Sequence, residues 1–319
     1  MITLLTKDGE KKTFSEVKLH LLSAENFKKK NFETKYVLTE EFIREFQRKL
    51  DFYALSMNQK LSEEIMEEFI WKLELTYICR FQELSEEFME RHSEKLDWYA
   101  VSRYQKMSEE FMRKHAEVLD WFNVSEYQTL SEDFIDTFAD KVDWEYISTY
   151  QTLSEEFMEK YSDKIYWVSV SEHQKLSEGF IEKYSNKVDW ENISNFQTLS
   201  EEFIDKHWFD VDWNSIVACQ QVSEEFLDKN FDRIEDTYYL VAKRKLSEEF
   251  LAKHIEVFGF RSIVRFQDLS ESFIETYAGD DDWGLIFKYQ QLSEPFIRKY
   301  CMKLYDIYTK VVDNYYDYY

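Results

Sequence analysis

The chain has 319 residues with only five Gly and one Pro, and its 64 acidic residues outnumber its 40 basic residues to give a net charge of −24. So few turn-forming residues predict a mostly helical chain. The charge argues against direct binding of nucleic acid or of anionic membranes, because their phosphates repel it. No apolar run reaches the about 18 residues that a transmembrane helix needs.

The start of the chain and the cysteines indicate an intracellular protein. The first residues lack the basic segment, apolar block and small-residue cleavage site of a signal peptide. Cys79, Cys219 and Cys301 are odd in number, widely separated and not spaced as metal ligands. This pattern fits reduced thiols in an intracellular compartment.

Residues 1–37 are predicted to form an N-terminal cap made of a β-hairpin and a helix. Two strand-like segments, residues 2–6 and 11–14, flank a turn at Asp8-Gly9. Asp-Gly between apolar runs indicates a hairpin. The segment is expected to cover the open apolar face of the first repeat, as the terminal units of a repeat array must.

From Leu38 onward the chain repeats itself every 23 residues, with one step of 24 from Val222 to Leu246. We number the positions of each unit 1 to 23 from its opening apolar residue. These opening residues are Leu38, Leu61, Leu84, Met107, Leu130, Leu153, Leu176, Leu199, Val222, Leu246, Leu269 and Leu292.

Positions 2 to 6 predict the start of a first helix in each unit. Position 2 is Ser in eleven units and Thr39 in the first, and two acids usually follow it, as in Glu132-Asp133. Ser and Thr are preferred N-caps, and acids in the first turn complement the helix dipole. Apolar residues at positions 1 and 6 form a hydrophobic staple. The apolar pattern then continues along one face of a helix of about 10 residues.

A second helix is predicted after position 14, where a capping Asp precedes a Trp, as in Asp97-Trp98. An apolar residue three positions later is followed by a small Ser, such as Ser102, where two helices can approach closely. The helix ends on an aromatic-Gln pair such as Tyr104-Gln105. The Gln column is expected to form a ladder that satisfies backbone groups between repeats.

Helices this short are marginal in water by themselves, so each pair must be stabilised by stacking on its neighbours. The predicted fold is all-α: a right-handed α-solenoid of about twelve 23-residue helix-turn-helix repeats with a short N-terminal β-hairpin cap. Its expected organisation is the cap at 1–37, eleven tandem repeats at 38–291 with an irregular unit at 222–245, and a C-terminal capping repeat at 292–319.

The pattern L-S-E-E-F-I…D-W…I-S-x-Y-Q resembles repeats in predicted proteins of large DNA viruses and bacteriophages. The resemblance extends from Leu38 to about Tyr300. It implies a viral origin, and with it the cytoplasm of the host cell. It implies no particular activity, because no biochemical function is known to be shared by proteins with these repeats.

Packing or capping explains the residues that might otherwise suggest chemistry. His92, His115, His207 and His254 share one column with Phe and Tyr, and adjacent copies would lie about 10 Å apart, too far to share a metal. The Trp column is expected to be core, because no basic groove accompanies it for base stacking. Carboxylate pairs recur at each repeat start, so none has the special environment that separates catalytic pKa values. We expect no enzyme activity, no metal and no cofactor.

Two functions remain open. The first is a non-catalytic repeat scaffold that binds a protein partner with a basic surface; with the viral resemblance, this becomes a protein that sequesters or inhibits a host factor. The second is an acidic mimic of nucleic acid that blocks a DNA- or RNA-binding host defence protein. The gross acidity of a regular unit approaches that of duplex DNA, which carries one charge per roughly 1.7 Å, although its net charge is about half as dense.

The sequence offers two candidate binding sites. Acids at positions 3 and 4 are expected to align in two rows along one edge of the solenoid, unless each only complements its own helix dipole for about 0.3–1 kcal/mol. These acids are Glu86, Glu87, Glu109, Glu110, Glu132, Asp133, Glu155 and Glu156. The second candidate combines Trp208 with the basic run Lys243, Arg244 and Lys245, where two units depart from the pattern. Drift in a tolerant repeat is the alternative explanation there.

Overall fold

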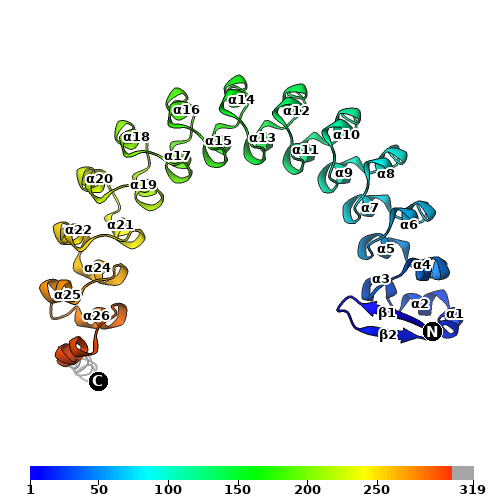
Figure 1. Cartoon of the computed structure of the whole chain (residues 1–319), viewed down its shortest axis with the longest axis horizontal. Helices are drawn as coiled ribbons and strands as arrows, with labels where there is room; N and C mark the ends of the chain where they lie inside the picture. The colour runs from blue at the N-terminus through cyan, green and yellow to red at the C-terminus, as the bar shows by residue number, and fades with distance from the viewer. Residues whose placement is uncertain (304–319) are drawn as a thin grey trace, which may run out of the picture. The chain divides into compact units, whose positions relative to one another are not determined.

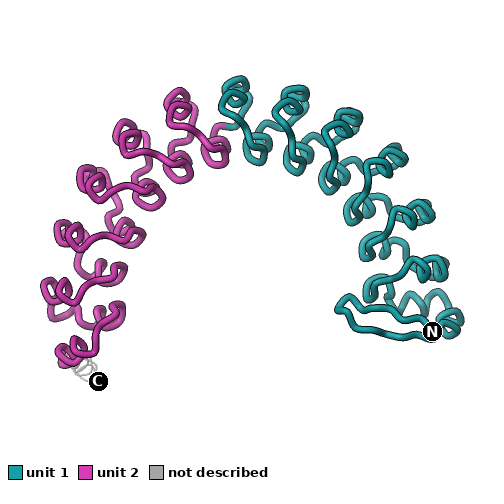
Figure 2. The backbone as a smooth tube through the Cα atoms, viewed as in Figure 1, with its two compact units in different colours: residues 1–166 teal, residues 167–319 magenta. Residues whose placement is uncertain are grey.

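The structure is a computed structural model, and it describes residues 1–303. The chain divides into two compact units, unit 1 over residues 1–166 and unit 2 from residue 167 onward (Figure 2). Within each unit, two short helices per repeat stack in regular succession, as the sequence predicts for a helical solenoid (Figure 1). None of the helices in residues 1–303 combines the length and the apolar character needed to cross a membrane.

The N-terminal cap contains the predicted hairpin and one further strand. Strands β1 (Ile2–Thr6) and β2 (Lys11–Phe14) pair antiparallel, and the turn between them places Gly9 at a φ of 88°, which favours glycine. Strand β3 (Tyr36–Val37), which the sequence did not indicate, pairs with the other edge of β1. The helices of the cap are α1 (Glu16–Leu21), α2 (Ala24–Lys28) and α3 (Phe32–Lys35).

The cap covers the first repeat, as expected for a terminal unit. Phe27 and Phe32 are fully buried, and they meet the first repeat through aromatic contacts. The ring centres of Phe27 and Phe46 lie 5.3 Å apart, and those of Phe32 and Phe42 lie 5.4 Å apart. Without the cap, these side chains of the first repeat would face water.

The first helix of each repeat is short, because the chain leaves helical geometry at position 9. His92, for example, has φ −112° and ψ 12°. The helices therefore have six or seven residues and not the predicted 10 or so. They are α4 (Glu40–Phe46), α6 (Glu63–Glu68), α8 (Glu86–Arg91), α10 (Glu109–Lys114), α12 (Glu132–Thr137), α14 (Glu155–Lys160), α16 (Glu178–Lys183), α18 (Glu201–Lys206), α20 (Glu224–Lys229), α22 (Glu248–Lys253) and α25 (Glu271–Tyr277).

The second helices begin where the capping Asp was predicted. The side chain of Asp97 accepts a hydrogen bond from the backbone N–H of Ala100 at 3.2 Å. These helices are α5 (Phe52–Asn58), α7 (Leu75–Phe81), α9 (Trp98–Tyr104), α11 (Trp121–Tyr127), α13 (Trp144–Tyr150), α15 (Trp167–His173), α17 (Trp190–Phe196), α19 (Trp213–Cys219), α21 (Thr237–Lys243), α24 (Phe260–Phe266) and α26 (Trp283–Tyr289).

The core runs along each unit between the two rows of helices. In the repeat that opens at Leu130, the side chains of Phe134, Ile135 and Ile147 are fully buried. The Trp column differs from the prediction, because Trp144 and its equivalents are half-buried and only Trp283 is buried. One part of each such Trp ring packs on the next repeat, and the rest of the ring is exposed to solvent.

The extra residue of the irregular unit at 222–245 is Glu235, which lies between the buried Ile234 at position 13 and the capping Asp236. Helix η1 (Phe231–Arg233) ends before Asp236, which caps α21 by accepting from the backbone N–H of Tyr239 at 2.8 Å. Thr237 occupies the place of the usual Trp. The next repeat adds α23 (Ile255–Phe258) before Gly259. Of the predicted capping repeat at 292–319, residues 294–303 are helical and residues 304–319 lie outside the described part.

Candidate binding surfaces

The Gln column joins each repeat to the one before it, as predicted. Gln105 accepts a hydrogen bond from the backbone N–H of Leu84 at 2.9 Å and donates to the carbonyl groups of Cys79 at 2.6 Å and Gln82 at 2.7 Å. Its side chain is buried, as are most of its equivalents. One amide therefore satisfies three backbone groups that no helix pairs, which fixes the stacking of repeats within each unit.

The acids at position 3 make a second contact between repeats, which the sequence analysis did not predict. Glu109 accepts hydrogen bonds from the backbone N–H of Ser131 at 2.6 Å and from its hydroxyl at 3.0 Å. In an ordinary capping box, an acid three residues into the same helix satisfies that N–H. Here Phe134 occupies that third helical position, so an acid of the preceding repeat accepts the hydrogen bond instead. Glu86 and Glu132 make the same contact with the next Ser.

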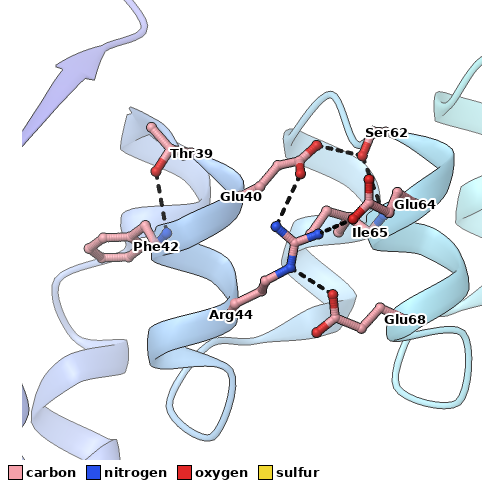
Figure 3. Close-up of polar contacts among 8 residues, drawn as sticks. All are labelled: Thr39, Glu40, Phe42, Arg44, Ser62, Glu64, Ile65 and Glu68. Atoms are coloured by element: carbon pink, nitrogen blue, oxygen red, sulfur yellow. Dashed lines mark hydrogen bonds and ion pairs between the residues drawn. The ribbon is translucent and has the colours of Figure 1, made fainter.

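The acids at position 4 are exposed, and some of them pair with an arginine of the preceding repeat. In Figure 3, Arg44 on α4 reaches Glu64 at 2.9 Å and Glu68 at 2.7 Å, both on α6. Arg113 repeats the arrangement by contacting Asp133 at 2.9 Å. Arginines of the preceding repeat therefore neutralise part of the acidic edge at these two places.

A further acid column, at position 7, is paired with the next repeat. Glu90 lies 2.6 Å from the amine of Lys114 and 2.8 Å from Nε2 of His115. Hydrogen bonds, first from Lys114 and then from His115, lower the pKa of Glu90. The ring of His115 also lies 4.8 Å from that of Trp98. The histidine column therefore packs as predicted and in addition forms hydrogen bonds with acids.

These contacts divide the predicted acidic ridge into two kinds of residue. The position-3 members Glu86, Glu109, Glu132 and Glu155 are half-buried, and the first three bind the next Ser. The position-4 members Glu87, Glu110, Asp133 and Glu156 are exposed. We call this second set the outer acid row.

The predicted site around Trp208 and the basic run separates into independent parts. Arg244 takes the place of a ladder Gln and donates to the carbonyls of Gln220 at 3.0 Å and Val222 at 2.7 Å. Burial lowers the pKa of its guanidinium. Lys245 pairs with Asp268 at 3.0 Å, and Lys243 lies over the ring of Tyr239.

The remaining member of that site, Trp208, lines a cavity of about 430 Å³ beside Trp213. None of Lys243, Arg244 and Lys245 lines this cavity.

A surface that the sequence analysis missed lies on the second helices of unit 1. Seven side chains from four consecutive repeats touch in a continuous series, which we call the aromatic–arginine ladder. Along the series, neighbouring ring centres lie 4.8 and 5.9 Å apart and each arginine lies 4.7–5.5 Å from the centres of two rings. Its members are Tyr53, Tyr77, Arg80, Phe81, Arg103, Tyr104 and Tyr127.

The ladder is open to solvent and free of acids over three helices. Tyr53 is 52% exposed, Phe81 45%, Tyr104 41% and Tyr127 42%, which is high for rings of this size. Helices α5, α7 and α9 contain no Asp or Glu, on a chain with 64 of them. Within unit 1 these helices lie along the inner side of the row, and the first helices lie along the outer side (Figure 1). Unit 1 thus carries the outer acid row on its outer helices and the aromatic–arginine ladder on its inner helices.

Two further groups with possible chemistry have simple explanations. Burial raises the pKa of the Cys79 thiol to about 11, so this cysteine stays protonated at neutral pH. Glu16, His20 and Glu45 have ligand atoms within 4.8 Å of one another, but all three are exposed and His20 bonds to Glu45 at 2.5 Å. An exposed hydrogen bond between His20 and Glu45 accounts for that group.

Comparisons of the chain with protein-family models, with curated proteins and with solved structures find no match.

Proposed function

We propose that this protein is a non-catalytic repeat scaffold that binds a protein partner through the aromatic–arginine ladder of unit 1. The observation that carries the proposal is the exposure of a continuous series of aromatic rings that the packing of the repeats does not bury. Aromatic and arginine side chains are the residue types enriched at the energetic centres of protein interfaces. A contiguous exposed apolar patch rimmed by polar residues is typical of an interaction site.

The repeat geometry favours an extended segment of the partner as the ligand. Packed helices lie about 8–10 Å apart, and an extended chain advances about 3.3 Å per residue. Each repeat therefore meets about three residues of such a segment. Arg80 and Arg103 are the charged members of the ladder, so acidic side chains in the segment would find partners there.

The alternative, an acidic mimic of nucleic acid, has less support from the contacts. Position-3 acids bind the next Ser, and position-7 acids bind Lys, Arg or His of the next repeat. Both columns have a structural reason to be acidic that does not depend on mimicry, so the outer acid row is the surface that a mimic would use. A partner with a basic surface would meet that row. The role of a viral protein that sequesters a host factor follows from the resemblance alone and stays a prediction.

The proposal is tested by selection from a random peptide library displayed against the whole chain. We expect the recovered peptides to be rich in acidic and aromatic residues and to bind unit 1. Recovery of mainly Lys- and Arg-rich peptides would instead favour the outer acid row and the mimic.

A further inference from the structure

In three successive repeats, a lysine of the next repeat lies over the Trp ring, at Trp121, Trp144 and Trp167. Lys164, at position 12, lies 5.8 Å from the centre of the Trp144 ring. Its amine also pairs with Asp140, at position 11 of the preceding repeat, at 3.0 Å. Lys141 repeats both contacts, with Trp121 and with Glu117. At these two places one cation and one acid therefore cover the Trp ring.

The repeat that opens at Leu199 breaks this arrangement. Trp208 and Phe209 stand at positions 10 and 11, where the repeat that opens at Leu130 has Ala139 and Asp140. The lysine is replaced by Arg233. Trp208 is 45% exposed and Phe209 is 83% exposed, so two large rings face solvent where the repeats that open at Leu84, Met107, Leu130 and Leu153 have a small residue followed by an acid.

The guanidinium of Arg233 already makes a cation–π contact with the Trp208 ring. Its guanidinium carbon lies 4.6 Å from the centre of the Trp208 ring and 6.0 Å from that of Trp213. Its Nη1 atom lies 2.5 Å from Oδ1 of Asn230 and 3.6 Å from Oδ1 of Asp205. The guanidinium thus serves as part of the wall and is already paired with an acid.

The cavity beside these rings holds an excess of negative charge. Its volume is about 430 Å³, and its walls include Trp208, Phe209, Trp213 and Arg233. Asp212, Asp232 and Glu235 also line it, which sets three carboxylates against one guanidinium. Asp232 and Glu235 are exposed. Aromatic faces next to uncompensated carboxylates attract cations through the ring quadrupole and through ordinary electrostatics.

We propose that this cavity, in the irregular part of unit 2, is a binding site for the cationic side chain of an arginine or lysine presented by another protein. The Trp208 and Phe209 rings contact the stem and the face of the side chain, and Asp232 and Glu235 pair with its charge. The site lies outside the aromatic–arginine ladder, so it stands whether or not that ladder binds a partner.

The experiment uses the whole chain and four capped amino acids as probes: the acetylated amides of arginine, lysine, norleucine and glutamate. Binding is followed by NMR through the indole N–H of Trp208, assigned with Trp208→Phe. The arginine and lysine probes should shift this signal in a saturable way, and the other two should not. Saturation by norleucine to the same degree, a preference for glutamate, or no response to any probe would overturn the proposal.

Two sets of variants locate the effect. Trp208→Ala with Phe209→Asp and Arg233→Lys restores the residues of a regular repeat, so the fold should persist, and calorimetric titration with the arginine probe should show at least tenfold weaker binding. Asp232→Asn with Glu235→Gln should weaken binding by a similar factor. Glu87→Gln with Glu110→Gln changes the net charge equally at a remote place and should have no effect. Undiminished binding in either pocket variant, or an equal loss in the remote control, would contradict the assignment.

Discussion

The backbone N–H of Ser131 donates to the carboxylate of Glu109, which belongs to the preceding repeat. The N-cap of one helix is thus completed by the first turn of its neighbour. This contact recurs along the chain, so a single pair of residue types both caps helices and joins repeats. It also gives a structural reason for the acid at position 3 of these repeats.

Replacing Glu109 with Ala should destabilise the protein by about 1.5–3 kcal/mol, the range for hydrogen bonds to a charged group. Glu110 is the matched control, because it is the adjacent residue, is exposed and belongs to the outer acid row. Glu110→Ala should change stability by less than about 0.5 kcal/mol. Urea unfolding of both variants measures the difference, and equal losses would show that the position-3 contact contributes nothing.

Replacing Gln220 with Leu should cost about 3 kcal/mol or more, because three backbone groups lose their partner at once. Gln220 accepts from the backbone N–H of Leu199 at 3.1 Å and donates to the carbonyls of Ser194 and Gln197. The neighbouring Gln221 is exposed, so Gln221→Leu makes the same chemical change without that loss. Thermal unfolding of both variants compares the positions. If the Gln column contributed little to stability, the two variants would have similar melting temperatures.

Replacing Trp144 with Ala should cost about 2–3 kcal/mol, less than the about 3–5 kcal/mol of a fully buried aromatic residue. The indole is half-buried, packs 4.6 Å from the Tyr161 ring and donates to the carbonyl of Ala139 at 3.0 Å. Tyr150→Ala on the same helix removes a ring that is 57% exposed and should cost under about 1 kcal/mol. A Trp144 variant that unfolds like the parent in urea would mean that this contact is not part of the core.

The position-7 acids predict a loss of stability in acid. Hydrogen bonds, first from a lysine and then from a histidine, lower the pKa of Glu90, Glu182 and Asp228 in the folded state. Unfolding restores their ordinary values of about 4, so the unfolded chain binds more protons in this range. The stabilisation is therefore complete above that value and is lost as the pH falls through the lowered folded values.

Thermal unfolding between pH 7 and pH 3 tests this dependence. The melting temperature should fall below about pH 5, and the fall should be shallower in a variant with Glu90→Gln, Glu182→Gln and Asp228→Asn. An unchanged slope in that variant would assign the acid sensitivity to other carboxylates.

Local patterns made the fold predictable, whereas the contacts between repeats were harder to foresee. The spacing of Ser85 and Asp97 located both N-caps of a repeat, and Asp8-Gly9 located the hairpin. Strand β3 has two residues and no pattern of its own, so pairing with β1 alone creates it. The hydrogen bonds of the Gln column were predictable. A Gln that recurs at the same position among apolar residues needs hydrogen-bond partners for its amide group.

The candidate surface was harder to predict for a physical reason. The aromatic residue before the Gln, such as Tyr104, is the last residue of its helix. At a helix end, the periodicity of apolar residues does not show whether a side chain faces the core or solvent. The contact of Arg103 with Tyr127 joins residues 24 positions apart, and only the stacking of repeats reveals it. Glu109 shows the opposite case, since a residue expected on a free surface is held by the next repeat.

The most direct test of the central claim is the affinity of a selected peptide for two variants of the whole chain. The ladder variant carries Arg103→Ala, Tyr104→Ala and Tyr127→Ala, and the outer variant carries Glu87→Gln, Glu110→Gln and Glu156→Gln. Circular dichroism should show that both keep their helices, since all six side chains are half-buried or exposed. Fluorescence anisotropy should give at least about tenfold weaker binding to the ladder variant, which is about 1.4 kcal/mol, and unchanged binding to the outer variant. Unchanged binding to the ladder variant, with a loss in the outer variant, would contradict the proposal that the inner face of unit 1 binds the partner.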